Sequence, residues 1–287
     1  MGEVGKGVWA MVAACAIWGL SPLFYALLSH VPPVEVLAHR TVWSLVTFGA
    51  VLAVQRRLRD LPRALDTPRK AGLVAAAAAM ISVNWLLFIF AVGAGRTVEA
   101  SLGYYIYPLV AVAIGALVLG EAMRPLQWVA VALAGLAVVL LTWCLGAAPW
   151  ISLVLAATFG VYGLIKRFVA AGPVVSVSAE VLVGLPLALG YIGWLFLSGA
   201  SALSLSDWGL LIASGPMTAT PLILFSYAAR RVAMATVGLI QYLNPSLQFI
   251  VAVTLLAETV TPWHAVALPI IWVALALYSW VSLRTVR

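Results

Sequence analysis

The sequence predicts an all-α integral membrane protein with ten transmembrane helices in two inverted five-helix repeats and with both termini in the cytoplasm. Of its 287 residues, 64% are hydrophobic and 9% are charged, and the mean hydropathy is +1.11. Soluble domains have roughly 45–50% apolar and about 25% charged residues, so a soluble fold is excluded. Two further observations support this fold class: apolar runs of span length recur along the chain, and landmark residues recur in its two halves.

The apolar runs follow one another with short breaks, and each has about the 20 residues that a membrane span needs. In the first half they cover residues 7–29, 33–55, 70–94, 97–119 and 126–145. In the second half they cover residues 149–168, 173–197, 207–229, 233–256 and 262–281. Proline and glycine lie at the breaks because neither continues a helix well. The longest polar stretch, 56–69, is too short for a soluble catalytic domain, so we expect the function to reside within the membrane.

The lysine and arginine residues predict the orientation. With the N-terminus inside, 14 of the 16 lysine and arginine residues fall on the cytoplasmic side. Only Arg96 falls outside, and Arg40 lies within the second span. Cytoplasmic loops of membrane proteins carry such an excess, which explains the net charge of +7 without a nucleic-acid partner.

The two halves share landmarks at an offset of 137 residues. The matched pairs are Tyr105 and Tyr242, Pro108 and Pro245, Glu121 and Glu258, Pro125 and Pro262, and Trp143 and Trp280. Earlier in each half, Trp18-Gly19-Leu20 is similar to Tyr162-Gly163-Leu164. Because each half holds an odd number of spans, the second copy enters the membrane from the opposite side. We therefore predict a first repeat at 1–147 and an inverted second repeat at 148–287, an arrangement typical of transporters with a midplane site.

Several motifs resemble a known family. Gly120-Glu121 followed by Gln127-Trp128 resembles the characteristic element of the EamA family, in the drug/metabolite transporter superfamily. The strings that resemble its RarD branch are His39-Arg40 with Trp43-Ser44, the run 84–88, the run 99–104, Tyr162-Gly163-Leu164 and Glu180. The second half has Pro262-Trp263 without the preceding glutamine, so the motif is degraded there. The resemblance implies ten helices in two inverted repeats, the cytoplasmic (inner) membrane of a bacterium, and export of small metabolites or drugs.

Polar and aromatic residues at midplane depth are candidates for a substrate cavity. Ser101, Tyr104, Tyr105 and Pro108 fall at i, i+3, i+4 and i+7, which is one helical face, and Gln241, Tyr242 and Pro245 repeat the spacing. We expect Pro108 and Pro245 to break their helices, because each frees a carbonyl group. Helix packing alone is the alternative account of this face, as it is for Asn84. The predicted cavity residues are Trp18, Asn84, Trp85, Tyr104, Tyr105, Gln241, Tyr242 and Asn244.

Charged residues within the spans are costly in lipid and so usually face a cavity or a partner. His39, Arg40 and Glu180 are the candidates for a coupling or charge-recognition role. Under this interpretation, Arg40 attracts a carboxylate and Glu180 accepts a proton or a substrate ammonium group. The alternative is a structural network that holds helices together. We expect an ion pair between Glu99 and Arg96, and solvated positions for Glu35 and Glu121.

These features predict a secondary transporter that exports small metabolites, such as amino acids or amphipathic drugs, by alternating access. The expected partners are a small-molecule solute, the lipid bilayer and protons as the coupling ion. An intramembrane enzyme or a non-transporting assembly factor is the alternative. An enzyme needs convergent nucleophile, base or metal ligands. His30 and His264 are expected at loop edges and every aspartate in a loop, so no catalytic residue, metal or cofactor is predicted, and no oligomeric state follows from the sequence.

Overall fold

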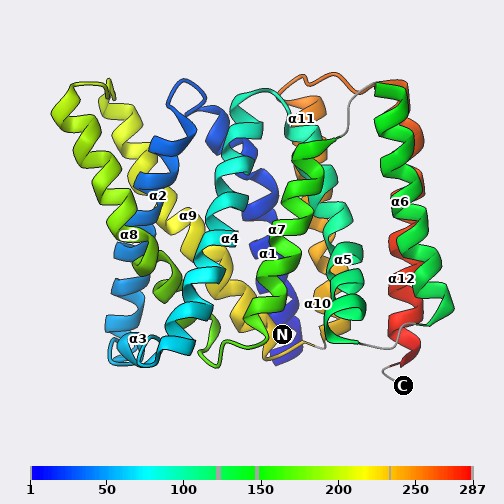
Figure 1. The fold of residues 1–287 in the computed structure, drawn as a ribbon, viewed down its shortest axis with the longest axis horizontal. Coiled ribbons are helices and arrows are strands. Elements are labelled where there is room, and N and C mark those ends of the chain that lie inside the picture. The colour runs from blue at the N-terminus through cyan, green and yellow to red at the C-terminus, as the bar shows by residue number, and fades with distance from the viewer. Residues whose placement is uncertain (1, 121–123, 146–148, 233, 286–287) are drawn as a thin grey trace.

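The computed structural model describes residues 2–120, 124–145, 149–232 and 234–285, and all regular elements in these ranges are helices (Figure 1). The first half contains α1 (Glu3–Ala26), α2 (Pro33–Val54), α3 (Asp60–Arg63), α4 (Pro68–Gly93), α5 (Thr97–Leu119) and α6 (Pro125–Leu145). The second half contains α7 (Trp150–Lys166), α8 (Pro173–Ser198), α9 (Leu205–Ala229), α10 (Met234–Gln241), α11 (Leu243–Thr254) and α12 (Pro262–Thr285).

Every predicted apolar run contains helix, which confirms an all-helical, multi-pass membrane fold. Among the residues that the structure describes, seven helices are long and apolar enough to cross a bilayer, and three shorter apolar stretches lie at Trp150–Lys166, Leu243–Thr254 and Pro262–Tyr278. The ninth run contains two helices, α10 and α11, separated by Tyr242, whose backbone dihedral angles stay in the right-handed helical region. The total of ten membrane crossings stays a prediction.

Local sequence explains where several helices begin and end. Proline occupies the first turn of α2, α4 and α8, where its missing N–H has no helical partner to lose. Ser204 and Asp207 form a capping box at the start of α9. Gly199 ends α8 with a φ of +65°, in the left-handed region that glycine adopts without strain.

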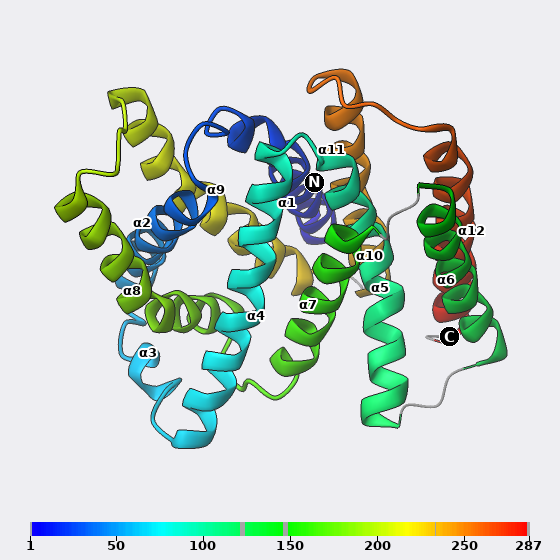
Figure 2. The same ribbon diagram turned by 45° about the horizontal axis from the view of Figure 1, so that its top comes forward.

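The helices form an elongated array. The α6–α12 pair lies at one end and α8 at the other, with α1, α4, α5 and α7 between them in both views (Figures 1 and 2). The chain begins α1 and ends α12 at the same face, the lower edge of Figure 1. Trp143, Phe196 and Leu197 are more than four-fifths exposed, as expected of apolar side chains that face lipid rather than water.

Helix packing links the two halves of the chain extensively. α1 packs on α9 and α11, whereas α7, its counterpart in the predicted second repeat, packs on α4 and α5. The pairs α2–α8 and α6–α12 each join equivalent helices of the two halves. Each of α1 and α7 thus packs on helices of the other half, as a two-fold relation between the halves would produce. The division into repeats at 1–147 and 148–287 stays a prediction.

The orientation of the chain can be tested with two exposed positions at opposite faces. Ala202 lies between α8 and α9, and Arg59 lies between α2 and α3. In a variant whose two native cysteines, Cys15 and Cys144, are replaced by alanine, we expect Ala202→Cys to react with an impermeant maleimide on intact cells. Arg59→Cys should react only after permeabilisation, because the positively charged face is predicted to be cytoplasmic. Reaction of both cysteines from one side would contradict the predicted topology.

Candidate functional site

A cavity of about 850 Å³ lies between the two halves of the chain. Its wall combines residues of α1, α2, α4 and α5 with residues of α7 to α12, so neither half encloses it alone. Most of the predicted site residues line it, namely Trp18, Arg40, Asn84, Trp85, Tyr104, Pro108, Gln241, Tyr242, Asn244 and Pro245. The structure brings these residues together, and their role in substrate binding stays a prediction.

The cavity extends toward the face that carries the termini. Lys166, the last residue of α7, lines it together with Ala171 from the connection to α8 and Pro173, the first residue of α8. At the opposite face, Glu258 joins the connection between α11 and α12 to the start of α5. Its carboxylate accepts hydrogen bonds from the backbone N–H groups of Thr97 and Val98, at 2.7 and 2.8 Å. A carboxylate at a helix N-terminus satisfies unpaired donors and complements the helix dipole.

Its predicted counterpart, Glu121, lies outside the described residues, so the match between the two glutamates is untested in space. The predicted pair of Arg96 and Glu99 is present, with Nε and Oε1 2.7 Å apart. Glu35 contradicts the expectation of a solvated position. It is 2% exposed and accepts a hydrogen bond from Ser201 Oγ at 2.5 Å, because the connection between α8 and α9 folds over it.

Asn84 combines the two roles that the sequence left open. Its Nδ2 atom donates to the carbonyl of Leu155 and to Thr158 Oγ1, both at 2.9 Å. Its Oδ1 atom accepts from the hydroxyl of Tyr104 at 3.0 Å. The side chain therefore ties α4 to α7 and α5 while it lines the cavity. This network fixes the position of the Tyr104 ring in the cavity wall.

Tyr105 does not line the cavity, although the sequence pattern placed it on the same face as Tyr104. It is buried in an apolar cluster, with its hydroxyl 2.7 Å from Ser246 Oγ and its ring against Trp272. Adjacent residues on a helix point about 100° apart, so only one side of the predicted stripe faces the cavity. The polar contact with Ser246 links α5 to α11 instead.

The two prolines differ in their effect on the helix. α10 ends at Gln241, whose carbonyl group cannot accept a helical hydrogen bond from Pro245 because proline has no N–H, and α11 begins at Leu243. Tyr242 between them keeps helical dihedral angles, so the helix is interrupted without a sharp change in the backbone. Pro108 lies inside a continuous α5, so the predicted break at Pro108 is wrong. Losing one backbone hydrogen bond is compatible with a long helix whose neighbouring turns remain paired.

Arg40 is buried and reaches the cavity from α2. Its Nε atom donates to Thr218 Oγ1 at 2.9 Å, and its guanidinium carbon lies 4.0 Å from the centre of the Trp85 ring. Gly215, one turn before Thr218, permits this arrangement. At Gly215, α9 lies so close to the backbone of α2 at Trp43 that no larger side chain fits. Among the described residues, no carboxylate lies within 4.0 Å of the Arg40 nitrogens.

Glu180 is buried behind the cavity wall, where three side chains contact its carboxylate. Its Oε1 atom lies 2.5 Å from Lys166 Nζ and 3.0 Å from Ser176 Oγ, and Tyr162 donates to its Oε2 atom at 3.0 Å. Lys166 and Tyr162 themselves line the cavity, so they separate the carboxylate from the space within. His39 lies elsewhere: its ring packs edge-on against Trp208, with the centroids 5.0 Å apart.

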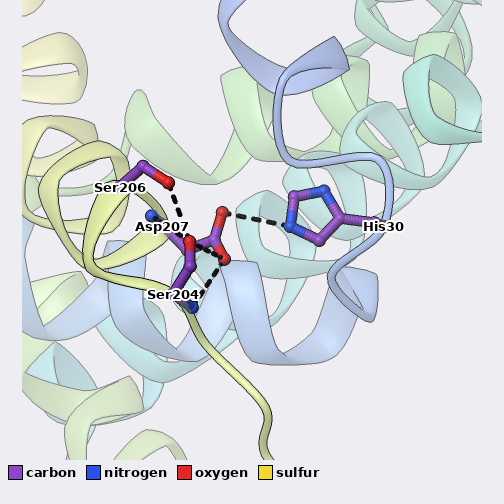
Figure 3. Close-up of polar contacts among 4 residues, drawn as sticks. All are labelled: His30, Ser204, Ser206 and Asp207. Carbon is purple, nitrogen blue, oxygen red and sulfur yellow. Dashed lines mark hydrogen bonds and ion pairs between the residues drawn. The ribbon is translucent and has the colours of Figure 1, made fainter.

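One aspartate and one histidine form a structural contact at the face opposite the termini. Asp207 caps the first turn of α9 and accepts a hydrogen bond or ion pair from His30 at 3.0 Å (Figure 3). Asp207 is therefore a buried helix residue rather than a loop residue, and His264 is also buried, contrary to expectation. Within the ranges that the structure describes, no three acidic, histidine or cysteine side chains are grouped as a metal site.

Sequence reasoning did not select several residues that line the cavity. On α7 these are Phe159, Tyr162, Gly163 and Lys166, which lie at i, i+3, i+4 and i+7. The same spacing relates Ile81, Asn84, Trp85 and Phe88 on α4. Each set therefore lies on one face of its helix, and this helical periodicity is the sequence signal that could have identified these residues.

The comparisons with known proteins agree with this architecture. Residues 5–143 match the model of the EamA-like transporter family. The chain is 47% identical to Protein RarD of Streptomyces exfoliatus, over 99% of this chain and 91% of that protein. It is 37% identical to Protein RarD of Escherichia coli (strain K12), over 99% and 97%, and 38% identical to an uncharacterized transporter of Vibrio cholerae, over 96% and 93%.

A solved structure, described only as "Crystal structure of protein", matches with a TM-score of 0.65, covering 96% of this chain and 98% of that chain. The two sequences are 17% identical, so this likeness shows a shared fold alone.

Proposed function

Because this chain belongs to the RarD branch of the EamA-like transporter family, we propose that this membrane transporter exports small organic solutes by alternating access through the cavity between its halves. The observation that carries the proposal is the cavity itself, which is walled by both halves and lined by aromatic and polar side chains. Transporter sites of this kind lie near the midplane at the interface of inverted repeats.

The contacts at the two ends of the cavity support an alternating mechanism. At one face, Glu258 holds the start of α5, and deeper in the bundle Tyr105 bonds Ser246 of α11. At the face of the termini, the cavity reaches the connection between α7 and α8. In the proposed cycle, the contacts at the first face open as an equivalent set forms at the second. The proposed setting is the inner membrane of a bacterium, with protons as the coupling ion.

A plug in the cavity tests this function without knowledge of the solute. A Cβ atom at Gly163 would meet only the Tyr107 hydroxyl, 4.0 Å away, so a side chain there extends into the cavity rather than into the backbone. We expect Gly163→Trp to remove transport while the protein still folds. Gly190→Trp on α8 is the matched control, because Gly190 is exposed and has no neighbour within 4 Å.

The measurement is an untargeted comparison of solutes inside and outside cells that express each variant at equal levels. Solutes exported by the wild type and by Gly190→Trp should stay inside cells that express Gly163→Trp. The same solute distribution in all three, at equal expression, would contradict transport through this cavity.

A further inference from the structure

The cavity wall has an asymmetric set of charges. Two cationic side chains line it, Arg40 and Lys166, whereas no aspartate or glutamate is among its lining residues within the described part of the chain. The charge of Lys166 is compensated by Glu180, 2.5 Å away. Arg40 has no such counterion among the residues that the structure places. The electrostatic field in the cavity is therefore set mainly by one uncompensated guanidinium group.

The hydrogen bonding of Arg40 is incomplete as well. The side chain is 7% exposed, and its Nε donor is used by Thr218. Its two terminal nitrogens have no acceptor among the residues that the structure describes. A buried guanidinium group without an anion or a full set of acceptors is costly, so a partner that supplies both is strongly favoured. A carboxylate matches the planar edge of a guanidinium group with two parallel hydrogen bonds.

Aromatic rings surround the guanidinium group of Arg40. The Trp85 ring covers one face of the guanidinium group, and Tyr25 lies 5.7 Å from its carbon. Phe88 packs between the rings of Tyr25 and Tyr104, which line the same cavity. Such walls bury the apolar or aromatic body of a solute. They would also attract a cation, but Arg40 already occupies the Trp85 face and repels one.

On the premise that the proposed function holds, we propose that the solute is an organic monoanion whose carboxylate binds the terminal nitrogens of Arg40 and whose apolar body packs against the aromatic wall. The site discriminates by charge. A neutral amide of the same shape loses the charge-assisted pair, and an amine of the same size meets an uncompensated positive charge. Both therefore bind more weakly than the carboxylate.

Three probes of similar size test this inference on the purified protein: phenylacetate, phenylacetamide and phenethylamine. Tryptophan fluorescence reports binding, because Trp18 and Trp85 line the cavity. We expect phenylacetate to bind roughly ten-fold or more tightly than either of the others. Equal affinities for the three probes would overturn the inference, and this comparison needs no variant. Displacement of phenylacetate by chloride at equal concentration would overturn it as well, since it would indicate a site for any anion.

Variants locate the site. Arg40→Gln should reduce phenylacetate affinity by roughly ten-fold and leave phenylacetamide affinity unchanged. Arg96→Gln is the matched control, because Arg96 pairs with Glu99 outside the cavity, and it should change neither affinity. If Arg40→Gln does not fold, Thr218→Val, which removes the acceptor at Nε, should weaken phenylacetate binding selectively. Unchanged affinity in the folded variants would overturn the assignment.

The Gly163→Trp comparison tests transport through the cavity and does not depend on the charge of the solute. If that comparison shows transport but the three probes bind equally well, the inference about anions is overturned and the proposed function is not.

Discussion

Replacing Gly215 with leucine should strongly destabilise the protein. A Cβ atom at this position would overlap the backbone carbonyl of Trp43 and lie 2.8 Å from Thr47 Oγ1. Backbone atoms cannot rotate away, so α2 and α9 must separate. Overpacking of this kind costs about 3 kcal/mol of unfolding free energy or more. The separation would also carry Thr218 away from Arg40, so solute binding should fall with stability.

Gly209→Leu is the matched control, because Gly209 lies on the same helix, is exposed and has no neighbour within 4 Å. Leucine has a higher helix propensity than glycine, so this variant should be as stable as the wild type or slightly more stable. The thermal midpoint and the elution profile in detergent measure both variants. Equal midpoints for Gly215→Leu and Gly209→Leu would contradict the close approach of α2 and α9.

The second large effect concerns the pair of Glu180 and Lys166. Glu180→Gln keeps the shape of the side chain but leaves the Lys166 ammonium, whose side chain is 22% exposed, without a counterion. Removing one partner of a buried ion pair costs about 3–5 kcal/mol, and the exposure of Lys166 places this pair toward the lower value. The double variant Glu180→Gln/Lys166→Met removes both charges. It should be more stable than the single variant, because no buried charge remains unpaired.

The same variants separate a coupling role from a structural one. The measurement uses proteoliposomes and a solute identified by comparing cells that express the wild type and Gly163→Trp. If Glu180 is a coupling carboxylate, transport of this solute should depend on pH. This dependence should be lost in Glu180→Gln and stay lost in the double variant, even where stability recovers. Retention of the wild-type pH dependence in the double variant would contradict proton coupling through Glu180 and leave a structural ion pair.

Much of the fold follows from the sequence because a bilayer restricts the choice of structure. Backbone groups in lipid must be paired internally, so an apolar run of sufficient length can be assigned to a helix. Pro33 and Pro173 mark helix starts for the same backbone reasons in the sequence and in the structure. The interruption of the ninth run is harder to place. Pro108 and Pro245 look alike in sequence, but only the helix that contains Pro245 is interrupted nearby.

The site could be predicted as a set of helical faces but not as a set of contacts. Periodicity identified Tyr104, and the midplane position identified Asn84. Periodicity also included Tyr105, because a stripe in sequence is wider than the part of a helix that faces a cavity. The pairing of Arg40 with Thr218 joins residues 178 positions apart, and it depends on the approach that Gly215 permits. Such contacts depend on how helices pack, which hydropathy and spacing do not specify.

The most direct test of the central claim, that one cavity serves the two faces of the membrane in turn, is the reactivity of a single cysteine at position 163 in the variant without Cys15 and Cys144. The cysteines at positions 202 and 59 calibrate labelling from each side. We expect Gly163→Cys to react with an impermeant maleimide both on intact cells and in inside-out vesicles, and reaction at either face to stop transport. Reaction from one face alone, under all conditions that support transport, would contradict alternating access through this cavity.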